Sequence, residues 1–254
     1  MPTPTPTATP TPVAVGAAAP VTFTILYDNN AGFPDLQTAW GFACLVESGE
    51  TTLLFDTGGD SAVLLSNMAL LGKDPRVIDL IVLSHIHGDH TGGLTGLLDH
   101  ADAPTVYVPA AFPASFKAGV RSRTTLVEVA APLQIAPGIM STGPVDGGIV
   151  EQALAVETAE GWAVVTGCAH PGIVSMVREA RACTDGEIAL VMGGFHLGQA
   201  SSAKLSAIIA DFEALGVQRA APTHCSGDRA RAAFSETFRG QTFLVGAGSV
   251  LVLE

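Results

Sequence analysis

Residues 80–94 of the chain read LIVLSHIHGDHTGGL, so a strongly apolar run leads directly into a cluster of titratable side chains. Imidazole nitrogens and carboxylate oxygens are common ligands of zinc and similar transition metals. In a helix, positions i and i+2 face different directions, whereas a turn through Gly88 would let such side chains converge. The stretch therefore predicts a metal-binding loop at the end of a buried strand. Its candidate ligands are His85, His87, Asp89 and His90.

Four donors on one short loop are enough to serve two adjacent metal ions. We expect His85 and His87 to hold one ion, and Asp89 and His90 to hold the other. The alternative is a polar turn whose histidines bind nothing. That alternative suits an isolated histidine better than it suits four donors within six residues.

Three further histidines also follow short apolar runs. The runs are VVTGCAHPG (164–172), LVMGGFHLG (190–198) and RAAPTHCSG (219–227), which contain His170, His196 and His224. Ligand sites in α/β folds usually follow the C-terminal ends of strands, so these histidines can gather with His85 at one edge of a sheet. His100 lies past a predicted helix, and we expect it at the surface.

Two other residues have an open role. Cys168 precedes His170 by two positions and could be a thiolate ligand, or simply a small buried residue, as free cysteines often are. Asp56 ends the run TTLLFD (51–56). It could accept a hydrogen bond from a metal-bound histidine, or it could cap a helix or turn without any metal.

The periodicity of the chain predicts mostly short strands at first and an alternation of strands and helices later. The expected strands are 21–27, 42–48, 51–59, 77–84, 104–109, 161–167, 187–194, 219–224, 242–246 and 249–254, with several more between 121 and 158. The expected helices are 60–71, 93–100, 172–183, 202–216 and 228–238. This order predicts an α/β fold in which two sheets pack face to face with helices outside.

Charge and composition limit the possible partners. The chain has 12 Lys and Arg against 24 Asp and Glu, a net charge of −12, which argues against nucleic acid or an anionic membrane. No apolar run is long enough to cross a membrane. We therefore expect a small-molecule substrate. The four cysteines form no CxxC pair and predict no disulfide framework.

Residues 1–20, MPTPTPTATPTPVAVGAAAP, form a Pro/Thr-rich segment that we expect to be extended and disordered. A single domain would then occupy residues 21–254. The composition of the segment suits a spacer after a removed export signal, which would place the domain outside the cytoplasm or at the cell surface. The alternative is a flexible tail on a cytoplasmic protein.

Five motifs occur in a fixed order along the chain. They are LLFDTGGD (53–60), LSHIHGDHTGGL (83–94), GCAHPG (167–172), GGFHLG (193–198) and PTHCSG (222–227). Together they resemble the metallo-β-lactamase superfamily, and in particular its branch of 7,8-dihydropterin-6-yl-methyl-4-(β-D-ribofuranosyl)aminobenzene 5′-phosphate synthase-like metal-dependent hydrolases. The resemblance runs from about Val21 to the end of the chain. It implies a four-layer αββα sandwich of two mixed β-sheets, with a dinuclear, usually zinc, site between them.

The resemblance also implies roles for the histidine cluster. His85 and His87 would bind one zinc ion, Asp89 and His90 would bind the other, and His224 would be the final ligand. Iron or manganese is the alternative to zinc.

The chain departs from the family pattern at three places. Residues 141–148, STGPVDGG, lack an expected histidine, and Cys168 stands where a bridging aspartate is expected. We therefore expect His170 to supply the missing ligand. Trp40 occupies a position where this branch has His-Gly, which predicts a different contact with substrate.

These features predict a hydrolase that uses a metal-activated water on an ester, lactone or phosphodiester-type substrate, with pterin- or phosphate-related compounds among the candidates. Asp89 would hold metal and also orient the nucleophile or take its proton. His196 would contact the developing oxyanion or the leaving group, or else stand unliganded near the groove. Two alternatives are a di-iron redox or oxygen-handling enzyme of the same fold, and a non-catalytic metal-dependent binding module.

Overall fold

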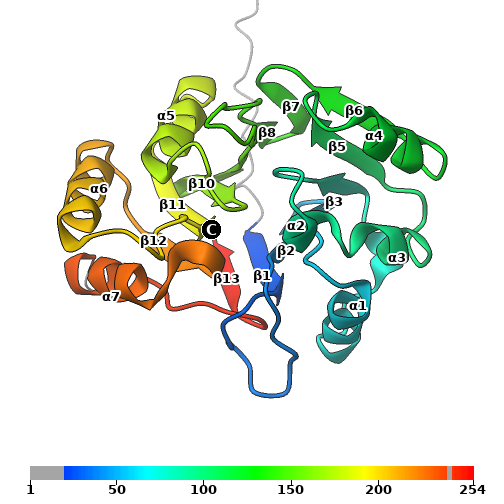
Figure 1. The fold of residues 1–254 in the computed structure, drawn as a ribbon, viewed down its shortest axis with the longest axis horizontal. Coiled ribbons are helices and arrows are strands. Elements are labelled where there is room, and N and C mark those ends of the chain that lie inside the picture. Colours follow the sequence, from blue (N-terminus) through cyan, green and yellow to red (C-terminus); the bar gives the residue numbers. More distant parts are fainter. Residues whose placement is uncertain (1–19, 239–241) are drawn as a thin grey trace, which may run out of the picture.

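The Pro/Thr-rich segment lies, apart from Pro20, outside the part of the chain that can be described. A computed structural model describes residues 20–238 and 242–254. Within these residues the chain forms two β-sheets with helices gathered on both outer sides (Figure 1).

The first sheet has seven strands in the order β13–β1–β2–β3–β4–β5–β6. The strands are β1 (Val21–Tyr27), β2 (Ala43–Ser48), β3 (Thr51–Phe55), β4 (Leu80–Val82), β5 (Thr105–Pro109), β6 (Leu126–Val129) and β13 (Val250–Leu253). Strands β3 to β6 are parallel, whereas the neighbours from β13 to β3 are antiparallel. The C-terminal ends of β3 and β4 therefore lie at the same edge.

The second sheet has six strands in the order β12–β11–β10–β9–β8–β7. The strands are β7 (Leu133–Ala136), β8 (Ile139–Ser141), β9 (Leu154–Thr158), β10 (Gly161–Thr166), β11 (Ile188–Gly194) and β12 (Ala220–Thr223). Strands β10, β11 and β12 are parallel, and the remaining neighbours are antiparallel. Both sheets are therefore mixed.

The helices fall into two groups on opposite sides of the sheets (Figure 1). The helices beside the first sheet are α1 (Ser61–Leu70), α2 (Gly88–Thr91), α3 (Leu94–Leu98) and α4 (Ala114–Arg121), with a 3₁₀ turn η1 at Pro75–Val77. The helices beside the second sheet are α5 (Ile173–Cys183), α6 (Ser202–Ala214) and α7 (Asp228–Thr237), with a 3₁₀ turn η2 at His224–Ser226. Of the first group, the short helix α2 lies nearest the middle of this view and closest to the second group.

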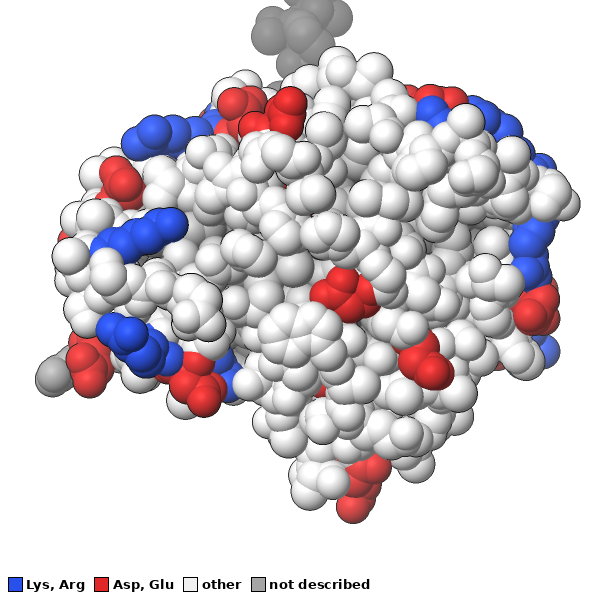
Figure 2. Space-filling model, in the orientation of Figure 1, with Lys and Arg blue, Asp and Glu red and all other residues white. Residues whose placement is uncertain are grey.

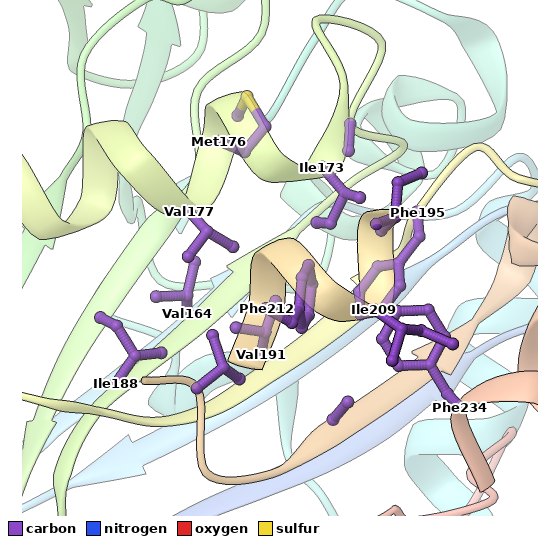
Figure 3. Packing of buried hydrophobic residues seen from close by; sticks show 14 of the residues in the cluster. Val164, Ile173, Met176, Val177, Ile188, Val191, Phe195, Ile209, Phe212 and Phe234 are labelled. Atoms are coloured by element: carbon purple, nitrogen blue, oxygen red, sulfur yellow. The ribbon is translucent and has the colours of Figure 1, made fainter. Parts of the chain in front are cut away.

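Three hydrophobic clusters hold the four layers together. One cluster lies between the sheets and joins Phe23 and Phe55 of the first sheet to Val165 and Met192 of the second. A second packs α1, α3 and α4 on the outer face of the first sheet. The third packs α5, α6 and α7 on the second sheet, where Phe195, Phe212 and Phe234 meet edge to face or tilted (Figure 3). Fully burying such side chains stabilises a fold by about 1.5–3 kcal/mol each.

The predicted α/β sandwich of two mixed sheets is confirmed, but some elements differ from the sequence-based expectation. Residues 242–246, predicted as a strand, form only an isolated bridge from Thr242 to Ala220. The predicted strand 77–84 is reduced to β4, because Pro75 begins a 3₁₀ turn that includes Val77. Helix α4 was not predicted. The predicted helix 60–71 is present as α1, and the Asp60 carboxylate caps it by accepting hydrogen bonds from the backbone of the first helical turn.

The parallel strands deliver the candidate ligands to one place. Asp56 directly follows β3, and His85 lies three residues after the end of β4, both at the same edge of the first sheet. Cys168, His196 and His224 follow β10, β11 and β12 of the second sheet in the same way. Because the sheets pack face to face, these two edges can meet.

None of the helices within the described residues combines the length and the apolar character that crossing a lipid bilayer requires.

Two exposed glycines test how the backbone sets local stability. A methyl group added at Gly119 or Gly49 would meet no atom within 4 Å, but Gly49 has φ +56° and Gly119 lies in helix α4. We expect Gly119→Ala to raise the free energy of unfolding by about 0.5–1 kcal/mol, because glycine is the poorer helix former. Gly49→Ala should lower it by about 1–2 kcal/mol, because φ is left-handed there. Urea unfolding of both variants measures the difference, and equal effects would contradict the assigned backbone conformations.

Candidate metal centre

The first sheet contributes the residues of the opening motif. His85 and His87 lie in the turn after β4, and Asp89 and His90 lie in the single helical turn α2. The sequence predicts a loop for the whole motif. This prediction is wrong for its second half, which forms α2. The motif still converges, since His85 Nε2 lies 3.2 Å from His87 Nδ1 and the rings of His85 and His90 are 4.2 Å apart.

A buried carboxylate fixes the orientation of His90. Asp56 Oδ2 lies 2.7 Å from His90 Nδ1, and the same carboxylate accepts hydrogen bonds from the backbone N–H and the hydroxyl of Ser84, each at 2.7 Å. Burial acts to lower the pKa of His90, but the carboxylates of Asp56 and Asp89 outweigh it and raise the pKa overall. In its neutral form, with Nδ1–H donated to Asp56, His90 has a free lone pair on Nε2. Of the two roles that the sequence allows for Asp56, the structure shows the hydrogen bond from a histidine of the motif. Asp56, Ser84 and His90 are all fully buried.

The second sheet brings Cys168 and His170 against the first. His90 Nε2 lies 3.2 Å from Cys168 Sγ, and the His170 ring is 4.8 Å from the rings of both His85 and His87. The expected meeting of His170 with the opening motif is therefore present in the geometry. No histidine comes from residues 141–148.

His224 completes the cluster from the end of β12. Its Nε2 lies 3.5 Å from Asp89 Oδ2, and its ring is 5.1 Å from that of His90. On its other side, His224 Nδ1 lies 2.8 Å from Asn29 Oδ1. Asn29 therefore orients His224 as Asp56 orients His90.

Glu151 is a functional residue that the sequence analysis missed. It is fully buried, and its carboxylate accepts backbone hydrogen bonds from Cys168, Ala169 and His170 at 2.8–2.9 Å. Burial raises the pKa of this carboxyl group. No motif marks Glu151, but it stands opposite Val145 in a bridge just before β9, and it holds the turn that presents Cys168 and His170.

The electrostatics favour the ligand forms of several groups. Burial lowers the pKa of His170 to about 4, and burial together with neighbouring imidazoles lowers the pKa of His85. For Asp89, burial acts to raise the pKa, but the imidazoles of His224 and His90 outweigh it and lower the pKa overall. His85 and His170 are therefore neutral and Asp89 is charged, which is the state in which each can bind a cation.

The donor set fits a transition-metal ion. The buried Nε2 of His170 has no hydrogen-bond partner among residues 20–238 and 242–254. Ligand atoms converge within 4.8 Å in three groups that share one thiol: Asp89, His90, Cys168 and His224; His85, Cys168 and His170; and Cys168, His196 and Cys225. Nitrogen, sulfur and oxygen donors at such distances match the preferences of zinc, and imidazoles and carboxylates also suit iron and manganese.

Strained backbone is concentrated at this cluster. Four of the five described non-glycine residues with positive φ are at the site, namely Asp56, Ala169, His196 and His224, with φ between 49° and 59°. Such conformations cost about 1–3 kcal/mol each and persist where the surroundings hold them in place. The strain is further evidence of a built site.

Two further residues of the sequence-based prediction lie beside the cluster, and a third lies outside it. His196 is exposed and its ring is 4.5 Å from that of His170. Trp40 is 60% exposed, and its ring lies 4.8 Å from that of His224, at the outer side of the site. His100 is exposed, as expected, and belongs to none of the donor groups.

Cys225 is a second residue of the site that the sequence motifs did not indicate. Hydrogen bonding with Cys168 and with His196 lowers the pKa of this thiol, whereas the same contact raises that of Cys168. All four cysteines of the chain are free thiols. Cys225 stands directly after His224 in the motif PTHCSG, and that position was the only signal in the sequence.

The two-sheet sandwich with this donor cluster places the chain in the metallo-β-lactamase-fold class. The family model of the metallo-β-lactamase superfamily matches residues 41–181. The chain is also 30% identical, over 85% of its length and 90% of the relative's, to 7,8-dihydropterin-6-methyl-4-(β-D-ribofuranosyl)-aminobenzene-5′-phosphate synthase of Methanocaldococcus jannaschii. The chain therefore belongs to the metallo-β-lactamase superfamily, in the branch of this synthase, which confirms the resemblance read from its motifs.

Solved structures agree on the fold. Tm1679, described as a metal-dependent hydrolase of the β-lactamase superfamily, superposes with a TM-score of 0.77 at 27% identity, covering 91% of this chain and 98% of that one. The metallo-β-lactamase fold protein YhfI of Bacillus subtilis superposes with a TM-score of 0.65 at 21% identity, covering 92% and 99%. The second likeness bears on the fold alone.

The contact between Asp56 and His90 generates a test. Asn accepts the left-handed backbone of residue 56, but its single oxygen cannot replace both carboxylate oxygens. While that oxygen accepts from Ser84 N–H, the NH₂ group faces His90 Nδ1–H and cannot accept its hydrogen bond. His90 would then turn or change tautomer, so we expect Asp56→Asn to weaken metal binding about 10–100-fold. Equilibrium dialysis against zinc measures the loss.

The matched control is Asp60→Asn in the same segment. Asp60 is an exposed helix cap, and asparagine caps a helix as well as aspartate does. Metal affinity should be unchanged in this variant. Equal affinities of the two variants would show that Asp56 has no part in holding metal.

Proposed function

We propose that the protein is a metal-dependent hydrolase that cleaves an ester, lactone or phosphodiester bond of a small molecule with water. The observation that carries this proposal is the convergence of nitrogen, oxygen and sulfur donors from the ends of strands in both sheets. Each sheet contributes about half of this cluster. Apolar side chains would hold the sheets together equally well, so the polar donors support a chemical role for this place.

Two neighbouring zinc ions fit the donors. His85, His87 and His170 would hold one ion, and Asp89, His90 and His224 would hold the other. The Cys168 sulfur converges with His85 and His170 and also with Asp89, His90 and His224, so it would contribute to holding the ions. His87 is in none of these donor groups of the described residues and reaches the cluster through His85, at 3.2 Å between ring nitrogens. When bound, such ions acidify water and draw electron density from a substrate oxygen.

The surrounding residues would position the reactants. The Asp89 side chain is 23% exposed, so it can reach a solvent-side molecule while its carboxylate faces His90 and His224. We assign Asp89 to orienting the attacking water and taking its proton. His196 is exposed and adjacent to His170, which suits it to donate a hydrogen bond to the oxyanion or leaving group.

The surface charge narrows the substrate class. Figure 2 shows Lys and Arg at the rim of the face that carries α2, whereas the middle is mostly uncharged with isolated acidic groups. Several basic side chains of the described residues are engaged by acidic partners, as in the pairs of Arg121 with Glu128 and Arg219 with Glu160. A neutral ester or lactone, or a phosphodiester with one negative charge, fits this face better than a polyphosphate does. The synthase name of the relative keeps pterin-linked substrates among those to test.

A screen of the metal-loaded protein tests the proposal. Purified protein is analysed for bound metals, loaded with zinc, iron or manganese in turn, and assayed on phosphodiester, lactone and β-lactam substrates. We expect turnover of at least one phosphodiester or lactone that a chelator abolishes and zinc restores. Tight metal binding without turnover would favour a binding module, and activity only with iron in the presence of an electron donor would favour a redox enzyme.

The role of Asp89 gives a sharper prediction. We expect Asp89→Asn to reduce turnover roughly 10²–10⁴-fold, because the amide keeps the shape but loses the charge and the basicity. The melting temperature should change little, since the side chain lies at the site rather than in the core. Turnover and bound metal are measured together on the substrate found in the screen.

Asp102→Asn is the control, because Asp102 is exposed and lies outside the donor groups. It should behave as the unaltered protein. Near-normal turnover of Asp89→Asn at full metal occupancy would remove Asp89 from the mechanism.

A further inference from the structure

A second concentration of sulfur lies beside the histidine cluster. Cys168, Cys225 and His196 form a donor group of their own, and two of its three residues have no part in holding the two ions assigned above. Cys225 Sγ also lies 3.6 Å from the carbonyl oxygen of Cys168. The proposed hydrolase gives Cys225 no role, although this residue lies beside Cys168 and His196.

The spacing of these donors approaches that of a tetrahedral site. Their ligand atoms lie within 4.8 Å of one another. Around a tetrahedral zinc ion with bonds of about 2.0–2.3 Å, ligand atoms stand roughly 3.3–3.8 Å apart. A contraction of about 1 Å, within reach of side-chain rotations, would close the group on an ion.

The backbone around the group lets the Cys225 sulfur pack against the turn that carries Cys168. A methyl group at Gly194 would lie 2.7 Å from Cys225 Sγ and 2.3 Å from the Gly167 carbonyl oxygen, so only glycine fits there. Ser226 ties the two loops together, because its hydroxyl accepts a hydrogen bond from Phe195 N–H at 3.0 Å and donates one to the Thr223 carbonyl at 2.6 Å. His196 is held with φ +52°.

We propose that Cys225, His196 and Cys168 form a third, sulfur-rich metal position that takes thiophilic ions such as Zn²⁺, Cd²⁺ or Cu⁺. Two thiolates and one imidazole are a ligand set that soft and borderline ions prefer. The position adjoins the histidine cluster through Cys168, which belongs to every donor group of the site. His196 is exposed, so the position can be reached from solvent.

A titration with Cd²⁺ tests the proposal. The full chain is kept reduced with a phosphine, which competes less for metal than a thiol does, and bound Cd²⁺ is followed by thiolate-to-metal absorbance and by equilibrium dialysis. We expect Cys225→Ser to weaken the binding of one Cd²⁺ ion at least about 10–100-fold and to reduce the absorbance by about half. His196→Ala should weaken the same ion while leaving more of the absorbance.

The control is Cys183→Ser, because Cys183 is a free thiol at the end of α5, outside all donor groups. It should bind Cd²⁺ as the unaltered protein does. His87→Ala should lose an ion of the histidine cluster and keep most of the absorbance, which separates this position from the proposed hydrolytic centre. Circular dichroism verifies that each variant is folded, and His196→Ala serves in place of Cys225→Ser if the latter is not.

Unchanged Cd²⁺ stoichiometry and absorbance in folded Cys225→Ser and His196→Ala would overturn the proposal. A disulfide between Cys168 and Cys225 that forms in air and persists in the phosphine, detected by mass, would overturn it as well. Unchanged Cd²⁺ binding would leave the proposed hydrolytic site untouched, whereas the disulfide would also remove the Cys168 thiol from it. Hydrolysis itself is measured separately through Asp89→Asn.

Discussion

The face-to-face packing of the two sheets is the constraint on which the rest of the molecule depends. An apolar layer that includes Phe23, Phe55, Val165 and Met192 sets how the sheets lie against each other. Each sheet contributes parallel strands, and the residues that follow their C-terminal ends meet in the histidine cluster. A ligand set split between the sheets exists only while this layer is intact, so whatever loosens the apolar layer also disperses the donors.

Two buried carboxylates hold the residues of the site in position at the edge of the packed sheets. Asp56 orients the first-sheet side through Ser84 and His90, and Glu151 holds the second-sheet turn through three backbone N–H groups. Both carboxylates are fully buried, and their hydrogen bonds offset the cost of leaving water. Their partners are backbone or neighbouring side chains, which fixes the donors before any ion arrives and reduces the ordering that binding requires.

Local signals in the sequence predicted most of this architecture. Apolar periodicity located most strands and helices, and the repeated pattern of strand, small residues and histidine anticipated that His170 and His224 would lie beside His85. Glu151 and Cys225 escaped because their importance comes from contacts between distant segments, and nothing next to them in the chain reveals those contacts. The strand expected at 242–246 failed for a related reason, since only Thr242 forms a bridge there and Leu244 is exposed rather than packed.

The position of Trp40 makes the site observable without a label. The chain has two tryptophans, and Trp162 is buried in β10 among the residues under α5, whereas Trp40 is exposed against the ring of His224. Indole emission depends on the polarity and the quenching groups around the ring. Light emitted by Trp40 therefore responds to whatever occupies the neighbourhood of His224, while Trp162 supplies a steady internal reference within the same molecule.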